Sequence, residues 1–337
     1  MPLNVLVTAV SRRVPLVRAF RHAINALGIK GSVIATDVNP LSPGVHFCDR
    51  AYNVPLSSDP AYLDAIADLC DAEDIGLIVP TIDEELPLFA SVAARFGRRG
   101  ITVAVSSEET THICNDKYTT CRYLRDAGIS AAESFLPGAM PAEPRLPMFI
   151  KPRLGRGSIG AVAVRTRKEL DFFLDYVDDP VAQEFLAGPE YTIDLLCDFE
   201  GRPISVVPRQ RVVIRAGVID RGRTVNDPQL IDLAVNCARA LHFVGPINIQ
   251  CRTVNGRPTI FEINPRFSGG IPLTIASGAD FPRWLLQMAL GHRLDPRIGQ
   301  FTPDLWMTNY ESSVFVEKVD QLLSIPQPSY LETAAVA

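Results

Sequence analysis

Short apolar runs alternate with amphipathic stretches over residues 1–107. The apolar runs are rich in Val and Ile, which is typical of buried parallel strands: Asn4–Val10, Ser32–Val38, Ile75–Pro80 and Ile101–Ser106. Between them, apolar residues recur at helical spacing in Pro15–Leu27, Ala61–Cys70 and Glu84–Phe96. This alternation predicts an α/β domain in which helices cover both faces of a parallel sheet.

The pattern changes after residue 110. A helix is predicted from Asn115 to Asp126, and a Pro-rich stretch at 136–147 predicts an exposed connection. Residues 148–198 resemble strands interrupted by one helix near Arg167–Tyr176, and a further helix is predicted over Pro228–Leu241. The fold class expected for the whole chain is α/β and α+β.

Polar residues follow the predicted strands of the first part. They lie in Thr8–Arg13, at residues 37–39 and at residues 81–85, where Asp83 and Glu84 stand out. Ligands of parallel sheets bind at the carboxyl ends of strands, so these residues are candidate substrate contacts. The same residues also suit turns and helix caps. The first strand is followed by no glycine fingerprint, which argues against a dinucleotide site.

A polar strand face is predicted near residues 248–270. The alternation of residues 259–264 puts Glu262 and Asn264 on one face, and an Asn-Gly turn joins this strand to the one that carries Gln250. One carboxylate and two amide oxygens suit a hard cation such as Mg²⁺. Arg266 follows closely and could hold phosphate oxygens. A solvated strand face would show the same pattern.

In the same strand, Phe261 and Ile263 are expected to point into apolar packing, away from the polar face.

A glycine-rich turn follows the strand that contains Lys151. The glycines Gly155, Gly157 and Gly160 flank Ser158, and residues 161–165 resemble a second strand. A glycine hairpin beside a lysine can fold over phosphates, because its backbone N–H groups bind oxygens and the lysine neutralises charge. Taken alone, the motif also fits an ordinary turn.

Two further stretches carry candidate chemistry. The segment Val181–Glu190 is a strand, a break and the start of a second strand, which can offer backbone groups to adenine and a carboxylate to ribose. Five arginines between residues 209 and 223 could hold phosphate or a carboxylate substrate, and alternation puts Arg209, Arg211 and Arg215 on one face. A solvated turn and a solvated basic face are the competing interpretations.

Composition narrows the classes of function. The 337 residues are 47% hydrophobic and 21% charged, as in ordinary globular proteins, and the net charge is −5 without a basic block. Nucleic acid is therefore not expected as a partner, and no apolar run is long enough for a membrane span. Seven scattered cysteines without a Cys-x-x-Cys pair indicate the cytoplasm.

The order of these motifs resembles the ATP-grasp superfamily, and in particular a single ATP-binding unit of the carbamoyl-phosphate synthase large subunit. The resemblance rests on Lys117, on Lys151 with its glycine hairpin, on QEFLAGPE, on NIQ and on EINPR. It implies a Rossmann-like pre-ATP-grasp domain at 1–110, a two-lobed ATP-grasp domain at 111–300 and a C-terminal extension at 301–337. The smaller lobe would span about 115–186 and the larger about 187–300.

The resemblance also implies roles for individual residues. Lys117 and Lys151 match phosphate-contacting residues, and the segment from Gly155 to Gly160, with Gly157 and Ser158, matches the loop over the triphosphate. The adenine hinge would be Glu184, Phe185 and Leu186, and the ribose-binding acid Glu190. The metal-binding set would be Gln250, Glu262 and Asn264 with Mg²⁺ or Mn²⁺, and Arg266 and Lys151 would stabilise the transferred phosphate. Arg215, Arg223, Asp83 and Glu84 remain candidate substrate contacts.

These roles predict an ATP-dependent carboxylate–amine ligase with a small acid and an amine as substrates. The acid would be phosphorylated by ATP, because the phosphate is a better leaving group than oxide. A single unit without a glutaminase domain argues against carbamoyl phosphate itself as the product. Use of bicarbonate or a carbamate, and a regulatory ATP-binding module without turnover, stay open. An exposed apolar face on the first domain would favour a homodimer.

Overall fold

The computed structural model describes residues 2–155, 157, 159–215 and 217–317. These residues form two compact units. The first comprises residues 2–105, 282–294 and 311–317, and the second comprises residues 106–155, 157, 159–215, 217–281 and 295–310. No helix in the described part of the chain is long and apolar enough to cross a membrane.

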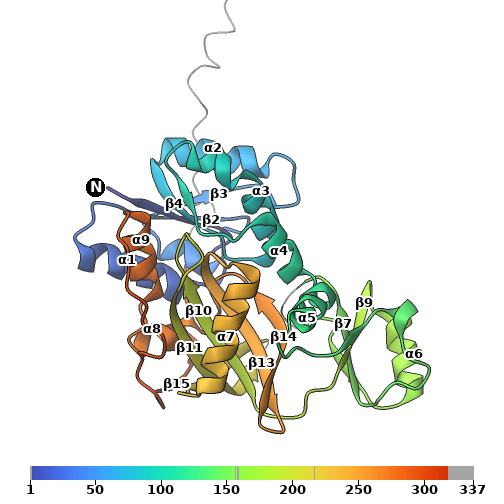
Figure 1. Cartoon of the computed structure of the whole chain (residues 1–337). Coiled ribbons are helices and arrows are strands. Elements are labelled where there is room, and N and C mark those ends of the chain that lie inside the picture. The colour runs from blue at the N-terminus through green and yellow to red at the C-terminus, as the bar shows by residue number, and fades with distance from the viewer. Residues whose placement is uncertain (1, 156, 158, 216, 318–337) are drawn as a thin grey trace, which may run out of the picture. The chain divides into compact units, whose positions relative to one another are not determined.

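The first unit is built on a parallel five-stranded sheet in the order β3-β2-β1-β4-β5. The strands are β1 (Asn4–Val7), β2 (Val33–Asp37), β3 (Arg50–Asn53), β4 (Ile75–Val79) and β5 (Thr102–Val103). The helices are α1 (Val14–Leu27), α2 (Tyr62–Ala72), α3 (Leu86–Gly97) and most of α9 (Phe281–Ala289), with short 3₁₀ turns η1 (Pro43–His46) and η2 (Asp83–Glu85). The predicted α/β organisation is confirmed (Figure 1). The strand β3 has no Val or Ile, which is why the hydrophobic pattern did not predict it.

The second unit contains two antiparallel sheets. A six-stranded sheet has the order β14-β13-β10-β11-β12-β15, and a four-stranded sheet has the order β6-β9-β7-β8. The six strands are β10 (Glu190–Cys197), β11 (Pro203–Arg215), β12 (Val218–Thr224), β13 (Gly245–Val254), β14 (Arg257–Asn264) and β15 (Trp306–Thr308). The four strands are β6 (Ser134–Phe135), β7 (Met148–Pro152), β8 (Val162–Val164) and β9 (Pro180–Glu184).

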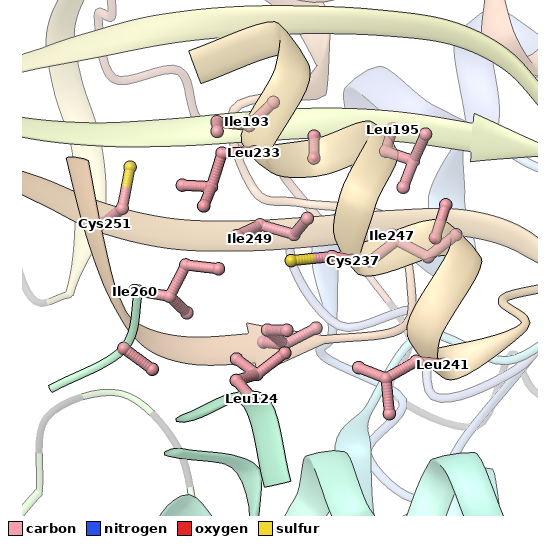
Figure 2. Close-up of a cluster of buried hydrophobic side chains, with 14 of the residues drawn as sticks. Leu124, Ile193, Leu195, Leu233, Cys237, Leu241, Ile247, Ile249, Cys251 and Ile260 are labelled. Atoms are coloured by element: carbon pink, nitrogen blue, oxygen red, sulfur yellow. The ribbon is translucent and has the colours of Figure 1, made fainter. Parts of the chain in front are cut away.

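The helices of this unit are α4 (Glu108–Asn115), α5 (Lys117–Asp126), α6 (Arg167–Tyr176), α7 (Pro228–Leu241) and α8 (Ile271–Ala276), with the 3₁₀ turn η3 (Pro137–Ala139). Helix α7 covers one face of the six-stranded sheet, where Ile193, Ile249 and Leu233 are buried (Figure 2). Successive strand residues point to opposite faces, so the polar residues between these apolar ones lie on the other face.

A buried ion pair lies on that polar face. The Arg209 guanidinium donates to both carboxylate oxygens of Asp194 at 2.8 and 2.9 Å, and the two side chains are 1% and 2% exposed. Asp194 also accepts from Asn248 Nδ2 at 3.1 Å and from Thr274 Oγ1 at 2.5 Å. Buried charges are stable only when they are paired and hydrogen-bonded, so this network joins β10, β11, β13 and α8.

A buried carboxyl group occupies the first unit. Glu85 is 2% exposed and accepts from Thr8 Oγ1 at 2.6 Å and from Tyr62 Oη at 2.5 Å. Burial raises the pKa of Glu85, although the hydrogen bonds from Thr8, Tyr62 and the Thr81 backbone oppose the shift. Glu85 therefore favours its neutral form in the folded protein more than in the unfolded chain.

Replacing Arg209 with Met should lower the free energy of unfolding by roughly 3–5 kcal/mol, because Asp194 is left as an uncompensated buried charge. The double variant Arg209→Met, Asp194→Leu should recover most of this loss, since it removes both charges. Chemical denaturation of the four proteins of this cycle gives the coupling energy. Additive losses of the two single variants would contradict the coupling.

Glu85→Gln should change how stability depends on pH. A raised folded-state pKa means that the folded protein binds the proton more tightly, so the contribution of Glu85 falls as pH rises above its usual pKa of about 4.3. Relative to the wild type, the variant should become progressively more stable as the pH rises from about 4.3 towards the raised folded-state pKa of Glu85. Thermal unfolding across this range measures the difference. The exposed Glu109→Gln is the control and should show no such trend.

Candidate active site

The register of the six-stranded sheet brings polar residues from four strands onto one face. Gln250 on β13 lies opposite Glu262 on β14 and opposite Thr192 on β10, and Thr192 in turn lies opposite Arg209 on β11. Two residues further along, Glu190 on β10 lies between Arg252 and Arg211. The face therefore places carboxylates, amides and guanidinium groups side by side.

The predicted metal ligands meet at the edge of this face. Asn264 Nδ2 donates to Glu262 Oε1 at 3.0 Å, and Arg266 Nη2 donates to Asn264 Oδ1 at 3.3 Å. Gln250 and Glu262 both line one cavity. The donor set fits a hard divalent cation, because it offers one carboxylate and two amide oxygens. Among the described residues there is no cluster of three or more His, Cys, Asp or Glu side chains that could hold a metal ion.

A bulge in this sheet adds a cavity contact to a residue that the sequence placed in apolar packing. Gln250 pairs with Glu262, but the next residue, Cys251, pairs with Ile260. Phe261 therefore has no partner on β13 and is the extra residue of a β-bulge. Phe261 lines the cavity, and Lys151 Nζ lies 5.4 Å from the centre of its ring. Phe261 is partly buried and packs against the apolar core as predicted, and its ring contributes to the cavity wall as well. Ile263 is buried in the core as predicted.

Two lysines lie beside the glycine hairpin that joins β7 to β8. Lys117 Nζ donates to the Gly155 carbonyl at 2.6 Å, and Lys151 Nζ donates to the Phe261 carbonyl at 3.3 Å. Burial lowers the pKa of Lys151, and the nearby Glu262 carboxylate opposes this shift. The strand–hairpin–strand arrangement predicted here is confirmed, since β7 and β8 pair as antiparallel strands.

Backbone conformation explains the glycines of this hairpin. Gly155, Gly157 and Gly160 have φ values of 95°, 71° and 71°, which residues with a Cβ rarely adopt. Gly157 also lies against Gly217, where a Cβ on Gly217 would come within 3.2 Å of the Gly157 backbone. Ser158 lies outside the described residues.

The segment between β9 and β10 forms a bend at one wall of the cavity. Glu184 Oε1 accepts from the backbone N–H of Glu133 at 2.8 Å, and Phe185 and Leu186 line the cavity. Gly188 approaches the next strand so closely that a Cβ there would lie 2.0 Å from the Thr253 carbonyl oxygen. This position therefore requires glycine.

Glu190 is held by two arginines. Its Oε1 lies 2.6 Å from Arg211 Nη1, and its Oε2 lies 2.6 Å from Arg252 Nη2. Arg211 also donates to Gln250 Oε1 at 3.2 Å and to the Gly217 carbonyl at 2.7 Å. Burial lowers the pKa of Arg211, and Glu190 opposes this shift.

Most predicted nucleotide and metal residues share one cavity of about 300 Å³. Its lining includes these predicted residues: Lys117, Lys151, Gly155, Gly157, Glu184, Phe185, Leu186, Glu190, Gln250 and Glu262. Asn264 adjoins the cavity because it donates a hydrogen bond to Glu262, and Arg266 adjoins it because it donates to Asn264. Gly160 packs beside Pro152, which also lines the cavity. The cavity can take an anionic ligand, because Lys117, Lys151 and Arg211 bring positive charge to its wall.

The candidate substrate residues are not among the residues that line this cavity. Arg215 is 64% exposed and lies 3.6 Å from Asp220, and Arg223 pairs with Asp304 at 2.8 Å. Asp83 is buried and Glu84 is exposed in the first unit. These four assignments stay predictions. The expected common face of Arg209, Arg211 and Arg215 was wrong, because the register shifts twice after Arg211 and leaves Arg215 solvated.

The sequence indicated Arg211 only as part of a basic face that could hold phosphate or a carboxylate substrate, and it gave no indication of Arg252. Both arginines matter because they lie opposite Glu190, and cross-strand register cannot be read from the order of residues alone.

Known families match most of the chain in two segments. Residues 5–104 match the PylC-like N-terminal domain, and residues 177–312 match the family described as ATP-grasp in the biosynthetic pathway with Ter operon. The arginine-specific large chain of carbamoyl phosphate synthase from Bacillus subtilis (strain 168) is 24% identical over 270 residues, which cover 74% of this chain and 25% of that relative. The chain spans 25–54% of the length of the curated relatives it matches.

Solved structures share the fold. L-amino acid ligase from Bacillus licheniformis superposes with a TM-score of 0.71 at 20% identity, covering 89% of this chain and 77% of that one. The biotin carboxylase domain of Hydrogenobacter thermophilus 2-oxoglutarate carboxylase, solved with MgADP and bicarbonate, gives 0.70 at 18% identity, with coverages of 91% and 74%. The matched segments, the relatives and the shared fold confirm the resemblance to the ATP-grasp superfamily that the order of motifs indicated.

Proposed function

We propose that this chain is an ATP-dependent ligase that activates a carboxylate as an acyl phosphate and joins it to an amine, releasing ADP and phosphate. The observation that carries the proposal is the single cavity that gathers Lys117, Lys151, the glycine hairpin and Glu262. The relatives and solved structures that match the chain include ligases and a carboxylase domain with bound MgADP, which supports the use of ATP and magnesium.

The residues have separable tasks in this proposal. The bend at Glu184, Phe185 and Leu186 holds the base, and Glu190 accepts from ribose hydroxyls. Lys117 and Lys151 hold phosphate oxygens, and the backbone N–H groups of the glycine hairpin cover them. Glu262, with Gln250 and Asn264, would hold a magnesium ion, which neutralises phosphate charge during transfer.

Phosphoryl transfer then depends on fixed positive charge. Arg266 is anchored by its hydrogen bonds to Asn264 and the Phe267 carbonyl, beside the proposed metal ligands. A preorganised guanidinium there stabilises negative charge that develops on the transferred phosphoryl group. The hairpin excludes water, so the amine rather than water attacks the activated carbonyl. The chain itself supplies no covalent nucleophile in this sequence of steps.

The partners in this proposal are a small carboxylic acid and an amine, and the location is the cytoplasm. Free thiols support that location: Cys48, Cys70, Cys121, Cys197, Cys237 and Cys251 form no disulfide. The segments 1–110, 111–300 and 301–337 remain the proposed domain boundaries.

A hydroxamate assay tests the proposed chemistry directly. Purified protein with magnesium-ATP is supplied with a panel of amino acids, small acids and bicarbonate, with and without hydroxylamine. We expect ADP release that depends on one acid, and a hydroxamate of that acid, because hydroxylamine traps acyl phosphates. ATP binding without turnover for any acid would favour a regulatory nucleotide-binding module, and no binding of ATP would contradict the proposal.

Glu262→Gln should lower acid-dependent ADP release by at least roughly 100-fold, since loss of several kcal/mol of charge stabilisation has this effect. Glutamine keeps an acceptor for Asn264 Nδ2, so the thermal midpoint should change little. The control is Glu200→Gln, an exposed residue between β10 and β11. Unchanged turnover in Glu262→Gln would remove this carboxylate from the mechanism.

A further inference from the structure

Arg252 combines three contacts that meet at one wall of the cavity. Its Nη2 lies 2.6 Å from Glu190 Oε2, and its Nη1 lies 3.4 Å from both the Leu186 and Gly188 carbonyl oxygens. The position follows from register, because Arg252 is two residues after Gln250 and lies opposite Glu190. One side chain therefore touches the proposed base-binding bend and the proposed ribose-binding acid.

Exposure distinguishes Arg252 from its neighbours. The side chains of Glu190 and Arg211 are 11% and 7% exposed, whereas that of Arg252 is 34% exposed. Arg252 also lines the cavity. Of these three ion-paired groups, Arg252 has the most surface left to meet a ligand.

The chemistry of the pair selects a type of ligand group. A guanidinium only donates hydrogen bonds, and a carboxylate only accepts them. A phosphate at this position would be repelled by Glu190, and an ammonium group would be repelled by Arg252. A hydroxyl satisfies both partners, because its oxygen accepts from Arg252 while its proton is donated to Glu190.

We propose that Arg252 and Glu190 together recognise the ribose hydroxyls of the nucleotide, so that Arg252 determines the preference for ATP over 2′-deoxy-ATP. The inference rests on the proposed use of ATP. It assigns to Arg252 a role in sugar specificity in addition to the support that it gives the bend at Leu186 and Gly188. Hydrogen bonds of this kind are charge-assisted on both sides, which makes them stronger than neutral ones.

A purely structural role for Arg252 predicts a different result. If Arg252 only supported the bend at Leu186 and Gly188, its loss would weaken the binding of ATP and of 2′-deoxy-ATP by the same factor, because both carry the same base and phosphates. If Arg252 contacts a ribose hydroxyl, its loss would weaken the binding of ATP more than the binding of 2′-deoxy-ATP. The ratio of the two dissociation constants therefore separates the two roles.

The test is calorimetric titration of the full chain, with magnesium, against ATP and 2′-deoxy-ATP. The wild type should bind ATP roughly tenfold more tightly, which corresponds to about 1.4 kcal/mol. In Arg252→Met the preference for ATP over 2′-deoxy-ATP should fall below about threefold, mainly because ATP binds more weakly. Arg252→Lys retains a cation that can donate to one hydroxyl, so its ratio should lie between those two values.

The matched control is Arg257→Met, which changes an exposed arginine on β14 of the same hairpin and outside the cavity lining. It should keep the wild-type ratio. An unchanged ratio in both Arg252 variants, or a wild type that binds both nucleotides equally, would overturn the inference but leave the ligase proposal intact. A wild type that binds neither nucleotide would instead contradict the proposed function. If Arg252→Met does not fold, the ratio in Arg252→Lys decides between the two roles.

Discussion

The ion pair between Asp194 and Arg209 is the constraint on which the site depends. It is buried on the polar face of the six-stranded sheet, where an unpaired charge would be costly, so the strands must align to keep it satisfied. Strand side chains alternate with a period of two residues, so this alignment also sets where the neighbouring polar residues lie. Glu190, Gln250 and Arg211 face the cavity because Asp194, Asn248 and Arg209 are held in register an even number of residues away, four in the case of Glu190 and two for the others.

The two faces of that sheet have different tasks. One face packs its apolar residues against α7 and α5, and this burial supplies the stabilising free energy of the sheet. The other face carries charges, which are kept in pairs or small networks before any ligand binds: Glu190 with two arginines, and Glu262 with Asn264. These groups are therefore held in place by the sheet itself, which is the preorganisation that electrostatic stabilisation of a ligand requires.

Glycine positions show where the backbone itself forms the site. Gly188 lets the bend after β9 pass against Thr253, next to Phe185 and Leu186, which line the cavity. The glycines of the β7–β8 hairpin have positive φ, which exposes backbone groups that a regular strand would pair. Both features were visible in the sequence as glycines, but the order of residues did not show which neighbour each one approaches.

Hydrophobic periodicity and motif order determined much of this protein from the sequence. They predicted the parallel sheet of the first unit, the strand–hairpin–strand arrangement beside Lys151, and the resemblance to the ATP-grasp superfamily, because these depend on local propensity and on spacing along the chain. Only the tertiary structure placed Arg252 and Arg211 on Glu190, buried Arg209 against Asp194 and turned Phe261 to the cavity. These features depend on cross-strand register and on a bulge, and both are decided by long-range pairing that no local pattern encodes.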